Sequence, residues 1–172
     1  MEHIIQLCEQ LPESARDLRL NVVAVLESEY LSPEEVWAVA LTSSYFVRNS
    51  ALQEAVLTDA QPILGEAGVE DAQAAASLMA MNTIYFRFRH MIGKEAYVQM
   101  RAGLRMNRIM SPLTSKRQFE MTALACAALS GCEACLQTHE ANLIQEGCSD
   151  LQINDAVRIA ATIQGVAVAL EL

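Results

Sequence analysis

Glycine, proline and aromatic residues are all scarce in this chain. Its 172 residues include 7 glycines and 4 prolines, and Phe, Trp and Tyr together make up 5%. A collagen-like, linker-dominated or intrinsically disordered chain is therefore excluded. Hydrophobic residues are abundant, at 52%, and include many strong helix formers, whereas the β-branched and aromatic runs typical of strands are missing. We therefore expect one compact, all-helical domain that needs no disulfide or metal staples.

Long hydrophobic runs are missing as well. The apolar stretches are far shorter than the roughly 20 residues that span a bilayer, and the start Met1-Glu2-His3 lacks the positive charge of a secretion signal. We therefore predict a soluble, cytoplasmic protein with no membrane partner. In a reducing cytosol, cysteines do not form a disulfide framework, so any pair at a special spacing is a candidate for redox or metal chemistry. The chain has five: Cys8, Cys126, Cys132, Cys135 and Cys148.

Positive charge is in deficit and unevenly placed. The net charge of −9 argues against a general affinity for nucleic acid or anionic lipid. Eight of the twelve basic residues lie between Arg87 and Arg117, where Glu95 is the only acid. We interpret this basic segment as a partner for acidic surface of the same chain or of a neighbouring copy. No nucleic-acid partner is predicted.

Turn signals divide the chain into helices with short connections. Ser32-Pro33-Glu34-Glu35 forms a capping box with Pro at the first helical position, and predicts a helix that fades near residues 48–50. Ser115 and Gln118 predict a second capping box, followed by an apolar helix that stops at Ser130-Gly131. The other predicted features are a helix after Pro12, a helix over 50–60 ended by Pro62, a turn at 65–68, an Ala-rich helix from Asp71, short pieces bounded by Gly93 and Gly103, and helices over about 132–146 and 150–170.

The two capped segments indicate an internal repeat. Residues 32–49 and 115–132 both run from a capping Ser through an apolar helix to a break, and the sequence over 68–71 resembles that over 147–150. We therefore predict a single all-α domain over 1–172, built from a duplicated helical unit. Its first half, about 1–90, is expected to be degenerate, and its second half, about 111–172, active. Only the second copy has cysteines at its break.

A Cys-x-x-Cys motif stands at that break. Cys132 and Cys135 follow the helix-stopping Gly131, and His139 comes four residues after the second cysteine. Spacings of three, four and seven residues place both thiols and the imidazole on one stripe of a helix. The helix start and its expected exposure favour a thiolate at Cys132, whereas His139 lies within reach of the Cys135 proton. From the residues alone, either thiol could be the activated one.

A carboxylate is expected beside this histidine. If Ser130-Gly131 is the hinge of a helical hairpin, Glu120 lies ten residues before the hinge and His139 eight residues after it. At about 1.5 Å per residue these positions are roughly 15 Å and 12 Å along their helices, so the two side chains face each other at similar height. Glu120 would then fix the tautomer of His139 and stabilise its cation.

Other roles are open to these cysteines. The motif and His139 could form a zinc clasp or a non-enzymatic redox switch, with Cys148 or His90 as a fourth zinc ligand. Structural zinc sites generally use a second ligand pair, and none is nearby in the sequence, so we predict no metal. We expect Cys8 and Cys126 to fill the core and Cys148, beside the Gly147 turn, to be exposed without being catalytic.

Taken together, these residues resemble the alkyl hydroperoxidase D (AhpD) family, within the carboxymuconolactone decarboxylase-like superfamily. The resemblance covers nearly the whole chain and is most specific at Glu120, Cys132, Cys135 and His139. Some members have a His between the two cysteines, where this chain has Ala134. The segments Met81-Asn82, Tyr85-x-Arg87, Gly103-Leu104-Arg105-Met106-Asn107 and Phe119-Glu120 also look like those of family members.

The resemblance implies an antioxidant enzyme, an alkyl hydroperoxide reductase or peroxidase that assembles as a homotrimer. Cys135 would attack a small peroxide and become a sulfenic acid, Cys132 would resolve it to a disulfide, and His139 with Glu120 would form the proton relay. No cofactor would be bound. Dihydrolipoamide from a lipoyl-bearing acyltransferase would reset the disulfide, and a peroxiredoxin (AhpC) would be the protein served. The enzymatic alternative is a superfamily decarboxylase acting on a lactone acid.

Overall fold

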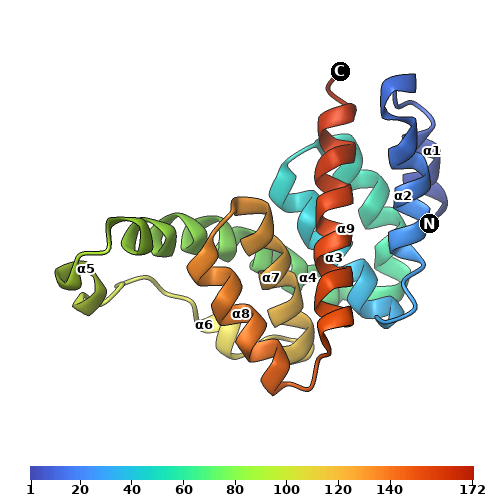
Figure 1. The fold of residues 1–172 in the computed structure, drawn as a ribbon. Coiled ribbons are helices and arrows are strands. Elements are labelled where there is room, and N and C mark those ends of the chain that lie inside the picture. The colour runs from blue at the N-terminus through green and yellow to red at the C-terminus, as the bar shows by residue number, and fades with distance from the viewer.

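The computed structural model describes residues 1–172, and the chain is helical throughout (Figure 1). The all-α prediction is confirmed, and no helix is both long and apolar enough to cross a membrane. The elements in chain order are α1 (Glu2–Cys8), a 3-10 turn (Glu13–Ala15), α2 (Arg16–Leu26), α3 (Pro33–Val47), α4 (Ser50–Ile92), α5 (Glu95–Gln99), α6 (Asn107–Met110), α7 (Lys116–Ser130), α8 (Glu133–Gln145) and α9 (Asp150–Ala169).

Helix α3 lies at the centre of the fold. Its start is fixed by the predicted capping box, in which the Ser32 hydroxyl accepts from the Glu35 N–H and the Glu35 carboxylate accepts from the Ser32 N–H. The helix packs against α4, α7 and α9, and it is buried on all sides over residues 35–44. These neighbours enclose α3 in the core, as expected for a helix buried all round, and one apolar cluster extends from α1 to α9.

Helix α4 is longer than the sequence predicts. The expected helix over 50–60 does not end at Pro62 but continues past it and breaks at Gly65, whose φ of 61° and ψ of −174° are accessible essentially to glycine alone. Pro62 is tolerated because its missing N–H leaves only one helical carbonyl, that of Thr58, without its usual partner, and Pro62 itself faces solvent. Gly68 lies inside the second stretch of α4, so the turn predicted over 65–68 is confined to Gly65.

The two capped segments have similar geometry. Helices α3 and α7 are each 15 residues long, and each is followed by a residue in the left-handed conformation, Arg48 and Gly131 respectively. The helices after them begin at the N-caps Asn49 and Cys132. The division into a degenerate and an active half stays a prediction.

The second predicted capping box is only half formed. Ser115 accepts the Gln118 N–H, but no return bond from the Gln118 side chain is present. A complete box occurs instead at the start of α9, between Ser149 and Gln152. The start of α7 is therefore held by one side-chain bond fewer than the start of α3.

After the first capped segment, apolar residues stand where cysteine and histidine stand after the second. Leu52 and Val56 stand three and seven residues after the N-cap Asn49, and both are fully buried. Helix α1, which was not among the predicted helices, packs against this part of α4. Asp59 holds it there by accepting from the backbone N–H groups of His3, at 3.2 Å, and Ile4, at 2.9 Å. Leu52 and Val56 are therefore part of the core.

An arm projects from the body of the protein and consists of residues 84–106, the end of α4, α5 and the following loop (Figure 1). The predicted breaks at Gly93 and Gly103 are both present, with φ of 63° and 66°. Large apolar side chains of the arm are exposed, namely Ile84, Phe88, Met91, Ile92, Val98 and Met100. The chain then returns to the body at α6.

Candidate active site

The Cys-x-x-Cys motif occupies the junction between α7 and α8. Gly131, with φ of 64°, ends α7 in a Schellman motif: its N–H donates to the Ala128 carbonyl and the Cys132 N–H donates to the Ala127 carbonyl, both at 3.1 Å. Cys132 is consequently the N-cap of α8 rather than a residue of its first turn, and Cys135 lies in that turn. The backbone of both cysteines is thus fixed by local hydrogen bonding, and both are free thiols.

The two thiols differ in access. Cys132 is 0% exposed and packs in a small apolar cluster with Met79, Ala123 and Cys126. Cys135 is 6% exposed and lines a pocket. The expectation that the helix start exposes Cys132 is therefore wrong, because the turn at Gly131 directs the N-cap residue into the core. Cys135 is the sulfur that a molecule in the pocket can reach.

Cys135 rests as a thiol near neutral pH. Burial raises its pKa to about 12, and the hydrogen bond to Cys132 and the charge of that neighbour act in the same direction. The Arg87 guanidinium, which donates to the Ser130 carbonyl at the end of α7, opposes this and lowers the pKa. Because the thiolate is the nucleophile, chemistry at Cys135 needs a base in the pocket.

His139 and Glu120 meet as the hairpin spacing predicts. The imidazole Nδ1 lies 2.7 Å from Glu120 Oε2, and both side chains are buried. Burial raises the pKa of Glu120, but hydrogen bonds from His139 and from Asn142, at 3.1 Å, together with the charges of His139 and Lys116, outweigh it and hold the pKa below its usual 4.5. An ionised carboxylate only accepts, so Nδ1 carries the hydrogen and a neutral ring keeps its lone pair on Nε2.

Cys135 and the His139–Glu120 pair share one pocket of about 280 Å³. Cys135 and His139 both line it, although no hydrogen bond joins the imidazole to either thiol. A molecule bound there would contact the sulfur and the imidazole together. The lining residues are Asn82, Phe86, Met106, Ile109, Met110, Glu120, Ala134, Cys135, Thr138, His139 and Asn142.

Several of these residues were not predicted as site residues. Asn142 follows His139 by three residues on α8, so helical spacing could have indicated it. Asn82, on α4, is buried with its amide oxygen unpartnered. Asn82 and Arg87 were recognised only as parts of family-like segments. The residues contributed by α6 carried no sequence signal, because nothing local places that short helix over the pocket.

The other cysteines and His90 lie elsewhere. Cys8 and Cys126 are buried in apolar clusters, as predicted. Cys148 was expected to be exposed and is 5% exposed, because its N–H donates to the Leu143 carbonyl in a second Schellman turn and draws the residue inward. His90 Nε2 lies 3.3 Å from the Glu133 carboxylate on the surface. No group of three or more His, Cys, Asp or Glu side chains is arranged to hold a metal ion.

Comparison with known proteins identifies the family of this chain. A sequence model of the carboxymuconolactone decarboxylase family matches residues 95–172. A protein named alkyl hydroperoxide reductase AhpD from Anaeromyxobacter dehalogenans strain 2CP-C is 50% identical over 164 residues, which cover 95% of this chain and 88% of that protein. Proteins of the same name from Anaeromyxobacter sp. strain Fw109-5 and Coxiella burnetii strain Dugway 5J108-111 are 47% and 41% identical, and cover 99% and 92% of this chain and 92% of each relative. With such identity over nearly its whole length, the chain belongs to the AhpD family of the carboxymuconolactone decarboxylase-like superfamily.

Proposed function

We propose that this protein is an alkyl hydroperoxide reductase that works through a Cys132–Cys135 dithiol cycle. The name shared by its relatives supports the reductase activity. The observation that carries the dithiol mechanism is the arrangement of the pocket: Cys135 and the Glu120-bound His139 line it, with Cys132 directly behind the first sulfur.

The first step is attack of Cys135 on the peroxide. Nε2 of His139 accepts the thiol proton, the sulfur attacks the nearer peroxide oxygen, and the O–O bond breaks. The imidazolium, stabilised by Glu120, returns the proton to the departing alkoxide, which leaves as an alcohol. Sulfur has then lost two electrons to the peroxide, and Cys135 is a sulfenic acid.

The second and third steps close the cycle. The Cys132 thiol attacks the sulfenic sulfur, water leaves, and a Cys132–Cys135 disulfide forms. An external dithiol then exchanges with the disulfide and is itself oxidised, restoring both thiols. The family resemblance implies that this dithiol is dihydrolipoamide carried by an acyltransferase, and that a peroxiredoxin (AhpC) is a second acceptor of the electrons.

The pocket favours a neutral substrate over the lactone acid of a superfamily decarboxylase. That alternative takes its support from the name of the matching family model. The carboxylate of Glu120 lines the pocket, and no Lys or Arg does. A second carboxylate brought beside Glu120 would be repelled by it, whereas a hydroperoxide carries no charge.

The decisive experiment is peroxide consumption with dihydrolipoamide, with and without a peroxiredoxin. Wild-type protein should consume cumene hydroperoxide, whereas Cys135→Ser and Cys132→Ser should each lose turnover. Cys132→Ser should accumulate a sulfenic acid at Cys135 that dimedone traps. Cys8→Ala, which changes a core cysteine far from the pocket, is the matched control. Full turnover in either serine variant contradicts the dithiol cycle.

We also propose that the chain assembles as a homotrimer. The arm supports this, because a row of exposed apolar side chains of this kind marks an interaction surface, and its basic residues complement the acidic remainder of the chain. Light scattering on the purified protein measures the mass directly. A monomer at micromolar concentration contradicts the proposal.

A further inference from the structure

One apolar wall of the pocket is built by α6 and the residue before it. Met106, Ile109 and Met110 supply the long aliphatic side chains among the lining residues, although Met110 is 83% exposed, and Phe86 of α4 adds the only phenyl ring. The other lining groups are polar or small, and they include the reactive sulfur and imidazole. An organic group bound in the pocket therefore finds most of its apolar contact at α6.

Helix α6 cannot hold this position by itself. It has only four residues, no side-chain cap and no buried residue, and a helix that short is unstable in isolation. It is joined to α5 by a loop and to α7 by the non-helical residues 111–115. Its place on the pocket must therefore be fixed by contacts to the rest of the molecule.

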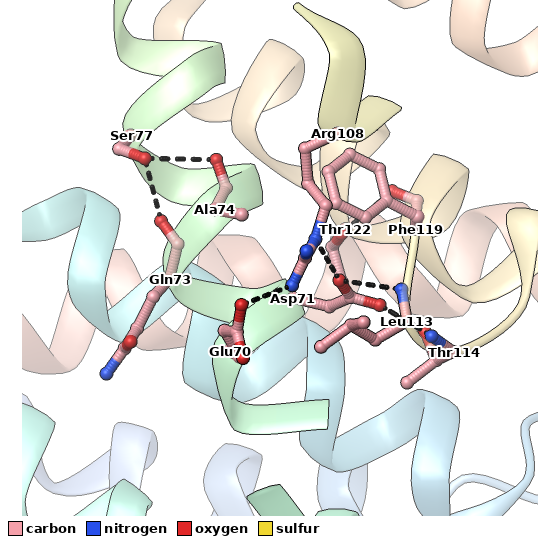
Figure 2. Close-up of polar contacts among 10 residues, drawn as sticks. All are labelled: Glu70, Asp71, Gln73, Ala74, Ser77, Arg108, Leu113, Thr114, Phe119 and Thr122. Atoms are coloured by element: carbon pink, nitrogen blue, oxygen red, sulfur yellow. Dashed lines mark hydrogen bonds and ion pairs between the residues drawn. The ribbon is translucent and has the colours of Figure 1, made fainter. Parts of the chain in front are cut away.

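Asp71 of α4 provides these contacts (Figure 2). Its carboxylate accepts from Arg108 Nε at 2.8 Å, from the Leu113 N–H at 3.1 Å, and from the N–H and hydroxyl of Thr114, both at 2.8 Å. Arg108 also pairs with Glu70 at 2.7 Å. Asp71 is thus bonded to α6 itself through Arg108, and to the segment just after α6 through Leu113 and Thr114. We refer to Asp71, Arg108 and Thr114 as the clasp.

The surroundings of Asp71 in the clasp favour its ionised form. Asp71 is only 4% exposed. Burial raises its pKa, but the Thr114 and Leu113 N–H groups, the Thr114 hydroxyl and the Arg108 guanidinium outweigh burial and hold the pKa below its usual 3.8. A buried carboxylate with four donors loses several bonds at once when its charge is removed. Neutralising Asp71 should therefore release the wall without touching the reactive groups.

We propose that Asp71 is a positioning residue that makes the enzyme selective for organic hydroperoxides, by fixing α6 as the apolar wall against which the organic group packs. This inference rests on the proposed peroxide reduction at Cys135. Hydrogen peroxide has no organic group and gains nothing from the wall, whereas cumene hydroperoxide buries a phenyl ring and two methyl groups against it. Loss of the clasp should therefore weaken binding of cumene hydroperoxide and leave binding of hydrogen peroxide unchanged.

A matched control exists on the same helix. Asp59 is also a buried aspartate of α4 that accepts backbone N–H groups from a distant segment, in its case α1. Asp59→Asn removes a comparable buried charge and comparable bonds, but it lies where α4 packs against α1, away from the pocket. A loss common to both variants reports general destabilisation, and a loss confined to Asp71→Asn reports the clasp.

The test compares kcat and KM of wild type, Asp71→Asn and Asp59→Asn with cumene hydroperoxide and with hydrogen peroxide, using excess dithiothreitol. In Asp71→Asn we expect KM for cumene hydroperoxide to rise about tenfold, with kcat for both peroxides and KM for hydrogen peroxide within about twofold of wild type. Arg108→Gln, at a partly exposed position, should shift KM in the same direction by a smaller factor, and it keeps the test informative if Asp71→Asn fails to fold.

The outcomes separate this inference from the proposed function. Hydrogen peroxide turnover by the wild type shows that the chemistry is present, and an unchanged ratio of the two substrates in Asp71→Asn and Arg108→Gln then overturns the role of the clasp. An equal change in Asp59→Asn overturns it too. Thiol alkylation tests the clasp without turnover: the rate at Cys135 with N-phenylmaleimide relative to iodoacetamide should fall in Asp71→Asn, and an unchanged ratio contradicts the proposal even if no peroxide is consumed.

Discussion

Replacing Glu120 by Gln tests the proton relay most directly, because the change removes a charge and almost nothing else. Gln has the same shape, and its amide oxygen can still accept from His139 Nδ1 and from Asn142, the two donors that the carboxylate now serves at 2.7 Å and 3.1 Å. Packing and the tautomer of His139 are thus preserved. What is lost is the negative charge that stabilises the imidazolium during proton transfer.

The size of the effect follows from the geometry. A hydrogen bond to a charged group contributes about 1 to 2 kcal/mol more than a neutral one, and the pair is buried and short, which places it toward the upper part of that range. At about 1.4 kcal/mol per factor of ten, Glu120→Gln should lower kcat/KM for a hydroperoxide by about tenfold to thirtyfold. Asn142→Ala removes a neutral donor from the same carboxylate and should cost only about threefold.

The assay is steady-state hydroperoxide consumption with excess dithiothreitol at neutral pH, accompanied by thermal unfolding of each variant. Glu120→Gln should unfold somewhat below the wild-type temperature, because the fold stabilises the ionised carboxylate, so kcat/KM is measured well below both transitions. Wild-type kcat/KM in Glu120→Gln refutes the reasoning. An equal loss in Asn142→Ala also refutes it, because the position of the Glu120 carboxylate rather than its charge would then determine kcat/KM.

Three further predictions concern thiol reactivity and pH. Cys132→Ala removes a hydrogen bond and a charge that raise the Cys135 pKa, so Cys135 should be alkylated by iodoacetamide faster than in wild type at pH about 8, as followed by mass spectrometry. Arg87→Met removes the cation that lowers this pKa, so alkylation should be slower; equal rates in both variants contradict the electrostatic account. The pKa values of Asp59 and Asp71 lie below the usual 3.8, so their stabilisation is fully present above that value and is lost as the pH falls below it toward the folded-state pKa values. Urea unfolding should show the free energy dropping as the pH falls below about 4, with a shallower drop in Asp71→Asn.

Local features of this protein could be predicted from its sequence. The capping box at Ser32 depends on residues within one turn of each other, and it is present in full. The meeting of Glu120 and His139 also followed from local information, because a hairpin of two helices with a short hinge fixes which residues stand at the same height. The all-α fold and the family could be predicted too, because they rest on composition and on a closely spaced motif.

Features that depend on distant contacts could not be predicted. Asp71 binds residues 37 to 43 positions away, and the pattern around it shows no more than a charged residue in an Ala-rich helix. The burial of Cys132 and Cys148 was missed for a related reason. In both cases a glycine turn was recognised, but the direction in which the Schellman motif turns the next residue depends on the core beneath it. The helix end predicted at Pro62 was wrong because the exposed helical turn before Gly65 tolerates the loss of one backbone hydrogen bond.

The buried apolar residues that follow the first capped segment allow mutations that lower stability to be distinguished from mutations that lower activity. Leu52 and Val56 stand where the helix after the second capped segment has Cys135 and His139, and truncating Leu52 to Ala leaves a cavity that destabilises a fold by about 2 to 5 kcal/mol. Such substitutions lower the amount of folded protein in a cell, but each folded molecule keeps its activity. On the proposed mechanism, substitutions at Cys135 and His139 do the reverse, so abundance and specific activity, measured side by side, identify which segment a mutation has changed.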